Sequence, residues 1–531
     1  MSFRTNESQQ MSIFDNAFGL TARELKALEK SWAKVFSEEV FPRIDENRFS
    51  VLYSEKASRP NTPVNVVIGA LIIKELFDLS DDEVVENLLL DPRYQYALHT
   101  SSFEEQPISD KTLTRFRQRC YDYEQTNGVD LYHDCVKDLA EATAKLMNID
   151  GRIRRMDSLM VESSIRKLSR TELLYKCIAK LVIYLHNNDM DDRIFPMNHY
   201  YEPDDFNSFI YHSRSTETDK RLEILLSDAD TLLERCQDLE DVTEYQLLVR
   251  CISEQTVKEK GKRRLKNKAD EMPSSIMQSP ADPDATYRTK AGKEYRGYVG
   301  NIEESVGSNG SVVTDYQFET NNTGDSAMLK NHLESMEKQE ETVKLIADGP
   351  YSGTENVKLA ADKNVELITT ELTGREVDVV MGAFTFNENG TKVLTCPAGN
   401  SPKSCTYIKQ SESCLISYDR EVCRNCPFQI HCKPKLFKRV SKVKVSYKTR
   451  ERAIAKAKMN TPEYKNLSKL RNGVETIPSI LKNVYDVNHM PVRGKVRCKF
   501  FFGCKVAALN FRKLFNYLKG LGNYASNPVL G

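Results

Sequence analysis

The feature that most constrains the fold is an alternation of strand-like and helix-like segments around two aspartates. Residues 153–162 (IRRMDSLMVE) have the pattern of a short strand that carries Asp157. Residues 342–347 (TVKLIA) have a second strand pattern, which ends at Asp348. A helical segment then leads to a third strand pattern at 365–372. Strand–helix–strand order predicts an α/β core.

The segment before this core, residues 61–146, has the patterns of several helices. Pro63 opens an apolar-periodic stretch, and Ser80 with Glu83 three positions later is a capping-box pattern. Ser109 or Asp110 is expected to cap the next helix, KTLTRFRQRC. One side of that helix is polar and basic, with Lys111, Arg115, Gln118 and Arg119, and the other carries Leu113, Phe116 and Cys120. The pattern fits a helix-turn-helix-like DNA-binding module, or a packing domain with a solvated basic face.

Further along the chain, residues 166–255 are expected to be helical and acidic, and a proline-containing loop interrupts at 270–290. Residues 294–318 contain two strand-like pieces divided by the turn sequence GSNG. Residues 391–440 are cysteine-rich and predicted to be irregular, and a helix is predicted near 462–486. These divisions suggest a helical region at 1–146, a core at 147–390 with a helical insert near 166–270, a cysteine-rich insert at 391–440, and a basic part at 441–531.

The acidic residues at the strands suggest metal chemistry. Carboxylates that converge at one sheet edge suit the hard cations Mg²⁺ or Mn²⁺, and two such ions can clamp the oxygens of a phosphodiester. Asp157 lies inside a strand pattern, and Asp348 lies at a strand end, where ligands bind in open α/β sheets. Strand-end aspartates also commonly begin turns or cap helices, so this pattern leaves both interpretations open.

The predicted helix at 462–486 supplies a third carboxylate. Arg471, Glu475 and Lys482 would share one face of a continuous helix, because offsets of four and eleven residues return to nearly the same angle. A carboxylate between two cations can hold a metal while the cations bind phosphate, although a salt-bridged surface has the same pattern. Pro478 is expected to kink this helix and to displace Lys482.

Charge is distributed very unevenly along the chain. The whole sequence has 76 Lys and Arg against 76 Asp and Glu. Residues 433–519, however, hold 23 basic and four acidic residues, an excess of 19. Such a segment is typical of a surface that binds a polyanion, or of a solvated lysine-rich surface. A second basic cluster, residues 258–268 (KEKGKRRLKNK), fits either a DNA-contacting arm or a linker.

Cysteines gather between the third strand pattern and the Glu475 segment. Cys423 and Cys426 form a Cys-x2-Cys knuckle, and Cys396 and Cys432 are the best pair to complete a closed tetrahedral site for structural Zn²⁺. Cys405, Cys414 and His431 compete for these positions, and free thiols are the alternative.

Length and apolar pattern exclude some classes of protein. A chain of 531 residues with 40% apolar residues suggests roughly three globular domains and argues against disorder. The longest apolar run, residues 66–73, is too short for a membrane span, so no membrane partner is expected. The first residues lack a signal-peptide pattern, so a cytoplasmic location with reduced cysteines is expected.

Three segments together resemble a known family. RMDSLMVESSI, LIADGPYSGTEN and the Arg-x3-Glu-x6-Lys pattern in RNGVETIPSILK resemble the three motif blocks of the DDE transposases of bacterial insertion sequences. PDATYRTKAGKEYRGYVGNI and VAALNFRKLFNYL also look like parts of that family, and the likeness covers about residues 40–520. The family pattern has a Tyr three positions before the Arg, where this chain has Ser468.

The resemblance implies a fold and an activity. The core would be an α/β catalytic core of ribonuclease H-like type with inserts, preceded by an all-α N-terminal DNA-binding region. Asp157, Asp348 and Glu475 would be the catalytic residues that bind Mg²⁺ or Mn²⁺, and Arg471 and Lys482 would position DNA. The N-terminal cations Lys111, Arg115 and Arg119 would bind DNA as well.

The implied function is DNA transposition. The enzyme would cleave double-stranded DNA at transposon ends and transfer a strand into target DNA, as a homo-oligomer in the bacterial nucleoid. The alternatives are a catalytically inactive DNA-binding protein descended from a transposase, a ribonuclease H-like nuclease without strand transfer, and a zinc-dependent interaction protein.

Overall fold

The computed structural model describes residues 1–6, 19–56, 59–100, 108–211, 218–259, 261–267, 269–369, 376–473 and 475–521. The chain forms two compact units. The first unit comprises residues 1–151, 158–324 and 476–531, and the second comprises 152–157 and 325–475. The strand β1 (Ile153–Glu162) therefore begins in the second unit and continues in the first.

The first unit begins with a helical region. Its helices are α1 (Ala22–Lys30), α2 (Trp32–Val35), α3 (Val64–Phe77), α4 (Asp81–Leu90), α5 (Pro92–Leu98), α6 (Asp110–Asn127) and α7 (Leu131–Leu146). Helix α3 starts directly after Pro63, and the predicted capping box of Ser80 and Glu83 begins α4. Ser109 caps α6, which resolves the choice between Ser109 and Asp110.

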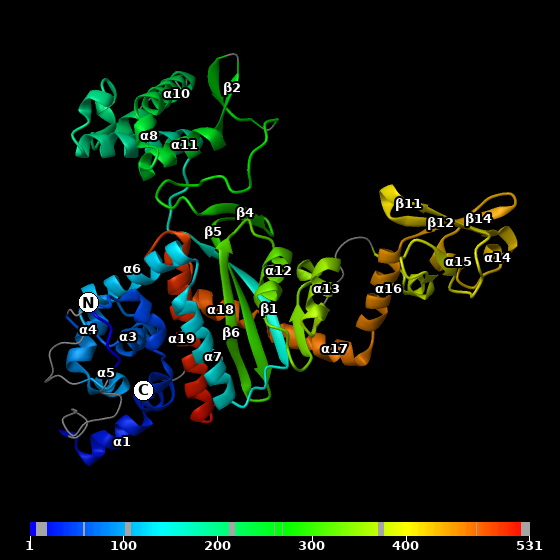
Figure 1. Ribbon diagram of the computed structural model, residues 1–531, viewed down its shortest axis with the longest axis horizontal. Coiled ribbons are helices and arrows are strands. Elements are labelled where there is room, and N and C mark those ends of the chain that lie inside the picture. The colour runs from blue at the N-terminus through cyan, green and yellow to red at the C-terminus, as the bar shows by residue number, and fades with distance from the viewer. Residues whose placement is uncertain are drawn as a thin grey trace. The chain divides into compact units, whose positions relative to one another are not determined.

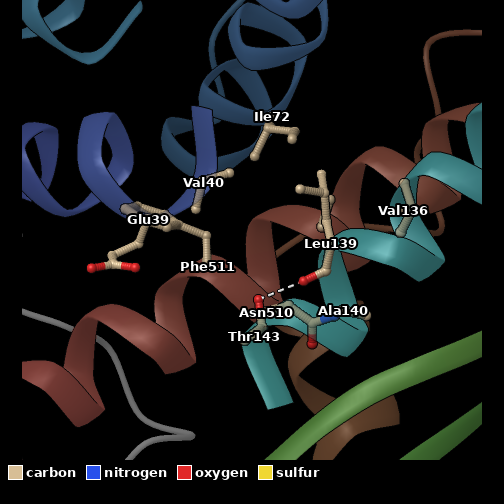
Figure 2. Close-up of a pocket in the computed structure, with 10 residues that line it drawn as sticks. Glu39, Val40, Ile72, Val136, Leu139, Ala140, Thr143, Asn510 and Phe511 are labelled. Carbon is tan, nitrogen blue, oxygen red and sulfur yellow. Dashed lines mark hydrogen bonds between the residues drawn. The ribbon is translucent and has the colours of Figure 1, made fainter. Parts of the chain in front are cut away.

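The helix α19 (Lys495–Leu518) organises the core of the first unit. It packs against α3, α6 and α7 and against the strand β6 (Gly310–Thr320), as Figure 1 shows for α7 and β6. Phe500 stacks on Tyr132 with ring centroids 4.1 Å apart, and Phe511 meets Phe36 edge to face at 5.1 Å. Residues far apart in sequence thus share one apolar core, which is the main source of stability in such a domain.

The strands of the first unit flank β1. Strand β5 (Lys293–Gly307) neighbours β1 and pairs antiparallel with both β4 (Thr286–Lys290) and β6. The predicted turn GSNG divides β5 from β6, as the sequence indicates. The helix α18 (Thr476–Asn483) also belongs to the first unit and precedes α19 in the sequence.

A helical insert within the first unit has a separate apolar core. It contains α8 (Arg170–Asn187), α9 (Asp205–Ile210), α10 (Thr218–Arg235) and α11 (Thr243–Gln255), followed by the hairpin of β2 (Thr256–Glu259) and β3 (Lys262–Leu265). The predicted helical character of residues 166–255 is confirmed.

The second unit contains the strand–helix–strand pattern predicted from sequence. The first residues of β1 pair in parallel with β7 (Val343–Ala347), and β7 pairs in parallel with β8 (Val365–Thr369). Helices α12 (Asp325–Ser335) and α13 (Thr354–Asp362) bury apolar residues on one face of these strands. Residues 370–372, the end of the predicted third strand, lie outside the described residues. The sheet of this α/β architecture is mixed, because it contains both parallel and antiparallel strand pairs.

The cysteine-rich segment is ordered rather than irregular. Strands β11 (Ser404–Ile408), β12 (Ser413–Asp419), β14 (Val440–Val445) and β13 (Lys435–Leu436) form a four-stranded antiparallel sheet in that order. The other elements are β9 (Thr385–Phe386), β10 (Val393–Thr395), α14 (Arg420–Arg424), α15 (Gln429–Cys432), α16 (Tyr447–Met459) and α17 (Pro462–Lys469). The prediction of irregular structure is wrong because alternate residues such as Cys414, Ile416 and Tyr418 form an apolar face.

Candidate functional site

Two of the predicted catalytic residues lie on adjacent parallel strands of the second unit. In the pairing of β1 with β7, Ile153 is opposite Lys344 and Arg155 is opposite Ile346. Asp348 continues the extended backbone of β7, with φ −70° and ψ 161°. Extending the register by two residues therefore sets Asp348 opposite Asp157. Neighbouring strands lie about 5 Å apart, so this extended register would place the backbones of the two aspartates side by side.

The two faces of β1 in this unit have different surroundings. Met156 is buried with the apolar residues of α12 and α13. Ile153 packs on the other face, against the cluster of Ile346, Ile368 and Tyr464. Side chains alternate along a strand, so Asp157 lies on the same face as Ile153 and Arg155. Asp157 and Asp348 are both half-buried.

The chain that leads to Glu475 runs along this second face. At its start, the hydroxyl of Tyr464 in α17 donates to the carbonyl of Thr369 (2.9 Å) and accepts from its amide (2.8 Å). Thr369 ends β8 and is opposite Ala347, the residue before Asp348. At the other end, Nη1 of Arg155 donates to the carbonyl of Leu470 (3.0 Å). The segment is thus attached both to β8 and to β1.

A glycine permits this close approach. Gly473 ends the 3-10 helix η12 (Leu470–Gly473), and a Cβ at this position would collide with Nη1 of Arg155. Glu475 follows two residues later, exposed and in a turn. Arg155 therefore holds the Glu475 segment against the strand that carries Asp157. Sequence reasoning overlooked Arg155, although its spacing of two residues from Asp157 in a strand was a usable signal.

The predicted continuous helix at 462–486 is wrong. The chain forms α17, then η12, a turn at Glu475, and then α18. Asn472 and Gly473 are poor helix formers at the point where the helix is interrupted. Pro478 does not kink a helix, because it lies in the first turn of α18, where its missing N–H costs no hydrogen bond.

This break removes the common face predicted for Arg471, Glu475 and Lys482. Glu475 is the last residue of the second unit, and Lys482 lies in α18 of the first unit. The backbone of Arg471 belongs to η12, and its side chain lies outside the described residues. Across the described ranges, no group of three or more His, Cys, Asp and Glu side chains is arranged to hold a metal ion.

The four cysteines proposed as zinc ligands line one small pocket of the second unit. Cys396 follows β10, Cys423 lies in α14, Cys426 follows α14, and Cys432 ends α15. Burial and the neighbouring thiols raise the pKa of Cys432 to about 11. Burial also raises the pKa of Cys423, against a hydrogen bond with Ser441 that lowers it. Four thiols are the donor chemistry of a closed tetrahedral Zn²⁺ site, although in this structure the four cysteines, like the other described residues, are not arranged around a common metal position.

The competing residues are engaged elsewhere. Sγ of Cys414 donates to the carbonyl of Thr391 (3.2 Å), and Sγ of Cys405 accepts from the amide of Val393 (3.4 Å). Burial and the adjacent Cys405 raise the pKa of Cys414 to about 11. Nδ1 of His431 lies 2.6 Å from a carboxylate oxygen of Asp378. These contacts favour the set of Cys396, Cys423, Cys426 and Cys432.

The cations predicted on α6 differ in exposure. Lys111 and Arg115 are exposed, while Arg119 is half-buried with its guanidinium 4.7 Å from the centre of the Tyr53 ring. Leu113, Phe116 and Cys120, which the sequence places on the opposite side of the helix, are buried. Arg117, which sequence reasoning did not single out, is buried and paired with Asp81 of α4. Part of the basic character of α6 therefore stabilises the helical region.

The basic cluster at 258–268 forms the hairpin β2–β3. Its arginines are paired within the insert, Arg263 with Asp230 and Arg264 with Glu259 and Asp270. Lys258 and Lys262 are exposed, and Lys260 and Lys268 lie outside the described residues. The two arginines therefore stabilise the insert rather than present a free basic arm.

The basic segment 433–519 also divides into two parts. In α19, Lys505 and Lys513 are buried and paired with Glu75 and Glu304 at 2.7 and 3.0 Å. In β13 and β14, by contrast, Lys435, Lys442 and Lys444 are exposed. The prediction of a basic surface along the whole segment is thus wrong for α19, whose buried lysines belong to the core.

Comparison with known proteins identifies a class that agrees with the motifs. Residues 395–515 match the family model described as Transposase DDE domain, and residues 26–119 match the model described as Transposase domain (DUF772). The two matches confirm the resemblance to DDE transposases of insertion-sequence type. Glu475 and the four pocket cysteines lie in the first match and α6 cations in the second, whereas Asp157 and Asp348 lie outside both. No curated protein and no solved structure matched the chain.

In the part of the chain that the structure describes, no helix has the length and apolar character needed to cross a membrane.

Proposed function

We propose that the protein is a DNA transposase that cleaves DNA at transposon ends and joins the freed strand to target DNA. The observation that carries this proposal is the register that sets Asp157 opposite Asp348 on adjacent parallel strands. The segment leading to Glu475 is attached to β1 through Arg155 and to β8, the neighbour of β7, through Tyr464. This arrangement supports a ribonuclease H-like core with Asp157, Asp348 and Glu475 as its carboxylates.

The proposed reaction has two displacement steps. In the first, water attacks a phosphorus atom at the transposon end, the bond from phosphorus to the 3′ oxygen breaks, and a 3′-hydroxyl is released. In the second, that hydroxyl attacks a phosphodiester of target DNA in line, a new phosphorus–oxygen bond forms, and a target 3′-hydroxyl leaves. Neither step forms a bond to the protein, so its contribution is positioning and charge neutralisation.

The carboxylates are the residues that would hold Mg²⁺ or Mn²⁺. Their oxygen donors fit these cations, and a bound divalent cation would lower the pKa of the attacking water and neutralise phosphate charge. Asp157, Asp348 and Glu475 must be ionised for this role, so activity is expected to fall in acid. Arg471 and Lys482, with Lys111, Arg115 and Arg119, are proposed to contact double-stranded DNA, and a homo-oligomer is proposed to pair two ends.

The central test uses the full chain, Mg²⁺ and two duplexes from the boundary of the element that encodes it, one uncleaved to follow cleavage and one pre-cleaved to follow strand transfer. Asp348→Asn and Glu475→Gln are each expected to lower strand transfer by at least about a hundredfold, because each removes charge that stabilises the transition state. Asp362→Asn and Glu334→Gln, which change exposed carboxylates at the end of α13 and in α12, are the matched controls and should stay near wild type.

The result separates the proposed activities. Retained transfer in both test variants would overturn the catalytic assignment. Cleaved but unjoined products from the wild type would favour a nuclease, and tight DNA binding without metal-dependent cleavage would favour an inactive descendant. Absence of DNA binding even at low salt would favour a zinc-dependent interaction protein.

Arg155 offers a second test of the site. We expect Gly473→Ala and Arg155→Met to loosen the Glu475 segment and to raise the Mg²⁺ concentration needed for half-maximal transfer. Displacement of a reacting group by about 1 Å can cost a hundredfold in rate. Lys358→Met, which changes an exposed cation of α13, is the control. An unchanged Mg²⁺ requirement in both variants would contradict the positioning role.

The cysteine pocket is proposed to hold structural Zn²⁺ through Cys396, Cys423, Cys426 and Cys432. The raised pKa of Cys432 means that Zn²⁺ must displace a proton there, so affinity should increase with pH. Metal analysis of the purified chain should find about one zinc per protein, lost in Cys423→Ser/Cys426→Ser and retained in Cys405→Ser/Cys414→Ser. Equal zinc in both double variants would exclude this ligand set.

A further inference from the structure

The four-stranded sheet of the second unit has one buried face and one open face. Cys414, Ile416, Val443 and Val445 form the buried face within an apolar cluster. The residues between them in β12 and β14 point to the opposite side, because side chains alternate along a strand. This open face carries three exposed lysines, named here the lysine face: Lys435, Lys442 and Lys444.

The lysine face places like charges together. Lys435 of β13 is directly opposite Lys442 of β14, and Lys444 follows two positions later on the same side. Directly opposed side chains on antiparallel strands lie about 5 Å apart, and like charges in this arrangement destabilise a sheet. An arrangement that costs folding free energy is consistent with selection for an anionic ligand.

No acidic partner compensates these charges. Among the described residues, none of the three lysines forms an ion pair with a carboxylate. The one acidic residue in the four strands, Asp419, is paired with Lys403. Nearby lysines of α16 differ, since Lys456 is paired with Glu376. Other lysines of this unit therefore have carboxylate partners, whereas the lysine face has none among the described residues.

Hydroxyl groups extend the open face across the sheet. Ser417, opposite Lys442, is buried, and its hydroxyl lies 2.6 Å from that of Ser404, the exposed residue opposite it in β11. The adjacent row runs from Lys444 through Leu415 to Thr406. Lysine ammonium groups and hydroxyls are typical donors to phosphate oxygens of DNA.

The loop between β13 and β14 enlarges the basic surface. Lys438 and Arg439 are exposed in this loop. Phe437 is also exposed, and Nζ of Lys442 lies 5.6 Å from the centre of its ring. Lysines two positions apart on a strand are separated by about 6.7 Å, a spacing commensurate with duplex DNA, which carries one phosphate per about 3.4 Å on each strand.

We propose that the lysine face binds the phosphate backbone of double-stranded DNA without reading its sequence. The proposal deepens the proposed transposase function and rests on it, because it names a surface by which that enzyme would hold its substrate. The open face offers ammonium and hydroxyl groups but no Asn, Gln or Arg in the four strands to form bidentate contacts with bases. Phosphate contact is thus the interaction that its chemistry favours.

The test measures binding of the full chain to a fluorescent 30-base-pair duplex of random sequence at several salt concentrations. The variant Lys435→Gln/Lys442→Gln/Lys444→Gln should bind at least about tenfold more weakly at low salt. The slope of log affinity against log salt should fall by about 2.7, the value for three lost phosphate contacts. The control Lys220→Gln/Lys338→Gln/Lys358→Gln removes the same charge from exposed sites elsewhere.

Several outcomes would overturn the proposal. Unchanged affinity in the test variant would do so, and so would an equal loss in the control, because the effect would then follow total charge. Loss of binding to phosphatidylserine vesicles with unchanged DNA binding would assign the surface to a membrane instead. Thermal melting checks folding, and a single Lys442→Gln variant, with an expected slope change of about 0.9, serves if the triple variant is unfolded.

Failure of the surface and failure of the proposed function give different results. If the wild type shows no metal-dependent cleavage but the test variant loses duplex binding, the transposase proposal fails and the DNA surface remains. If cleavage and strand transfer occur while both triple variants bind the duplex like wild type, the enzyme stands and the lysine face is excluded as a DNA site.

Discussion

The two lysine-rich parts of the basic segment 433–519 have opposite structural roles. In α19, Lys513 is 2% exposed and contacts Glu304 and Ser311, while Lys505 contacts Glu75. In the sheet of the second unit, Lys435 and Lys442 are exposed and opposite each other. One set of lysines is buried and paired with carboxylates of the core, and the other is exposed and has no carboxylate partner among the described residues. The net charge of a segment therefore does not show whether its lysines are buried and paired or exposed.

The largest expected effect concerns Lys513. Lys513→Met would remove the buried cation that faces the buried carboxylate of Glu304, and breaking a buried ion pair from one side typically costs about 3–5 kcal/mol of unfolding free energy. Denaturant unfolding of the full chain measures this loss, and Lys442→Met is the control with the same chemical change at an exposed site. The double variant Lys513→Met/Glu304→Met should recover most of the stability. A loss no larger than that of Lys442→Met would break the comparison.

A smaller loss is expected for Lys505. Its partner Glu75 also lies 3.3 Å from Lys74, so Lys505→Met leaves the carboxylate with one cation. The expected cost is about 1–3 kcal/mol, as for a buried polar group that loses one partner. Combining Lys505→Met with Lys74→Met should cost more than the sum of the two single changes. If the stability losses of the two single variants simply add, the buried carboxylate of Glu75 does not need either Lys74 or Lys505 as a remaining partner.

Lys499 connects this comparison with pH. Burial lowers the pKa of Lys499. The carboxylates of Asp130 and Glu124, at 2.8 and 3.0 Å, together raise this pKa by more than burial lowers it, so the net shift is upward. A cation with a raised folded pKa contributes stability that is complete below its unfolded pKa of about 10.4 and is lost as pH rises through the folded value.

Denaturant unfolding between pH 8 and 11.5 tests this expectation. Wild type should lose more stability across that range than Lys499→Met, and the difference between them should shrink as pH rises. Lys444→Met should follow the wild-type curve, because Lys444 is exposed. If the unfolding free energies of wild type and Lys499→Met fall in parallel as pH rises, deprotonation of Lys499 does not contribute to the loss of stability at alkaline pH.

The smallest effect is expected on the lysine face. Lys442→Gln/Lys444→Gln should change unfolding free energy by no more than about 0.5 kcal/mol, with a gain favoured because like charges are removed. Thermal and denaturant unfolding measure it alongside the duplex-binding slope. A loss above about 1 kcal/mol would indicate that these lysines stabilise the sheet, as the buried lysines of α19 stabilise the core.

Local patterns predicted the elements that depend on neighbouring residues. The strand that carries Asp157, the strand that ends at Asp348 and the capping box at Ser80 all depend on local pattern, and the structure contains them. The i, i+4 spacing of Arg471 and Glu475 does not predict the break before Glu475, which lies where Asn472 and Gly473, two poor helix formers, interrupt the helix. The sheet of the cysteine-rich segment was missed because short alternating runs in β12 and β14 are weak signals by themselves.

The sequence by itself determined the carboxylates at the strands, the four grouped cysteines and the resemblance to transposases. Only the tertiary structure decided the register that aligns Asp157 with Asp348, the attachment of the Glu475 segment to Arg155, and the burial of the α19 lysines. Lys513 and Glu304 are 209 positions apart, and Lys505 and Glu75 are 430 apart. Burial and ion pairing depend on contacts between such distant residues, whereas strand and cap patterns depend on a few consecutive ones.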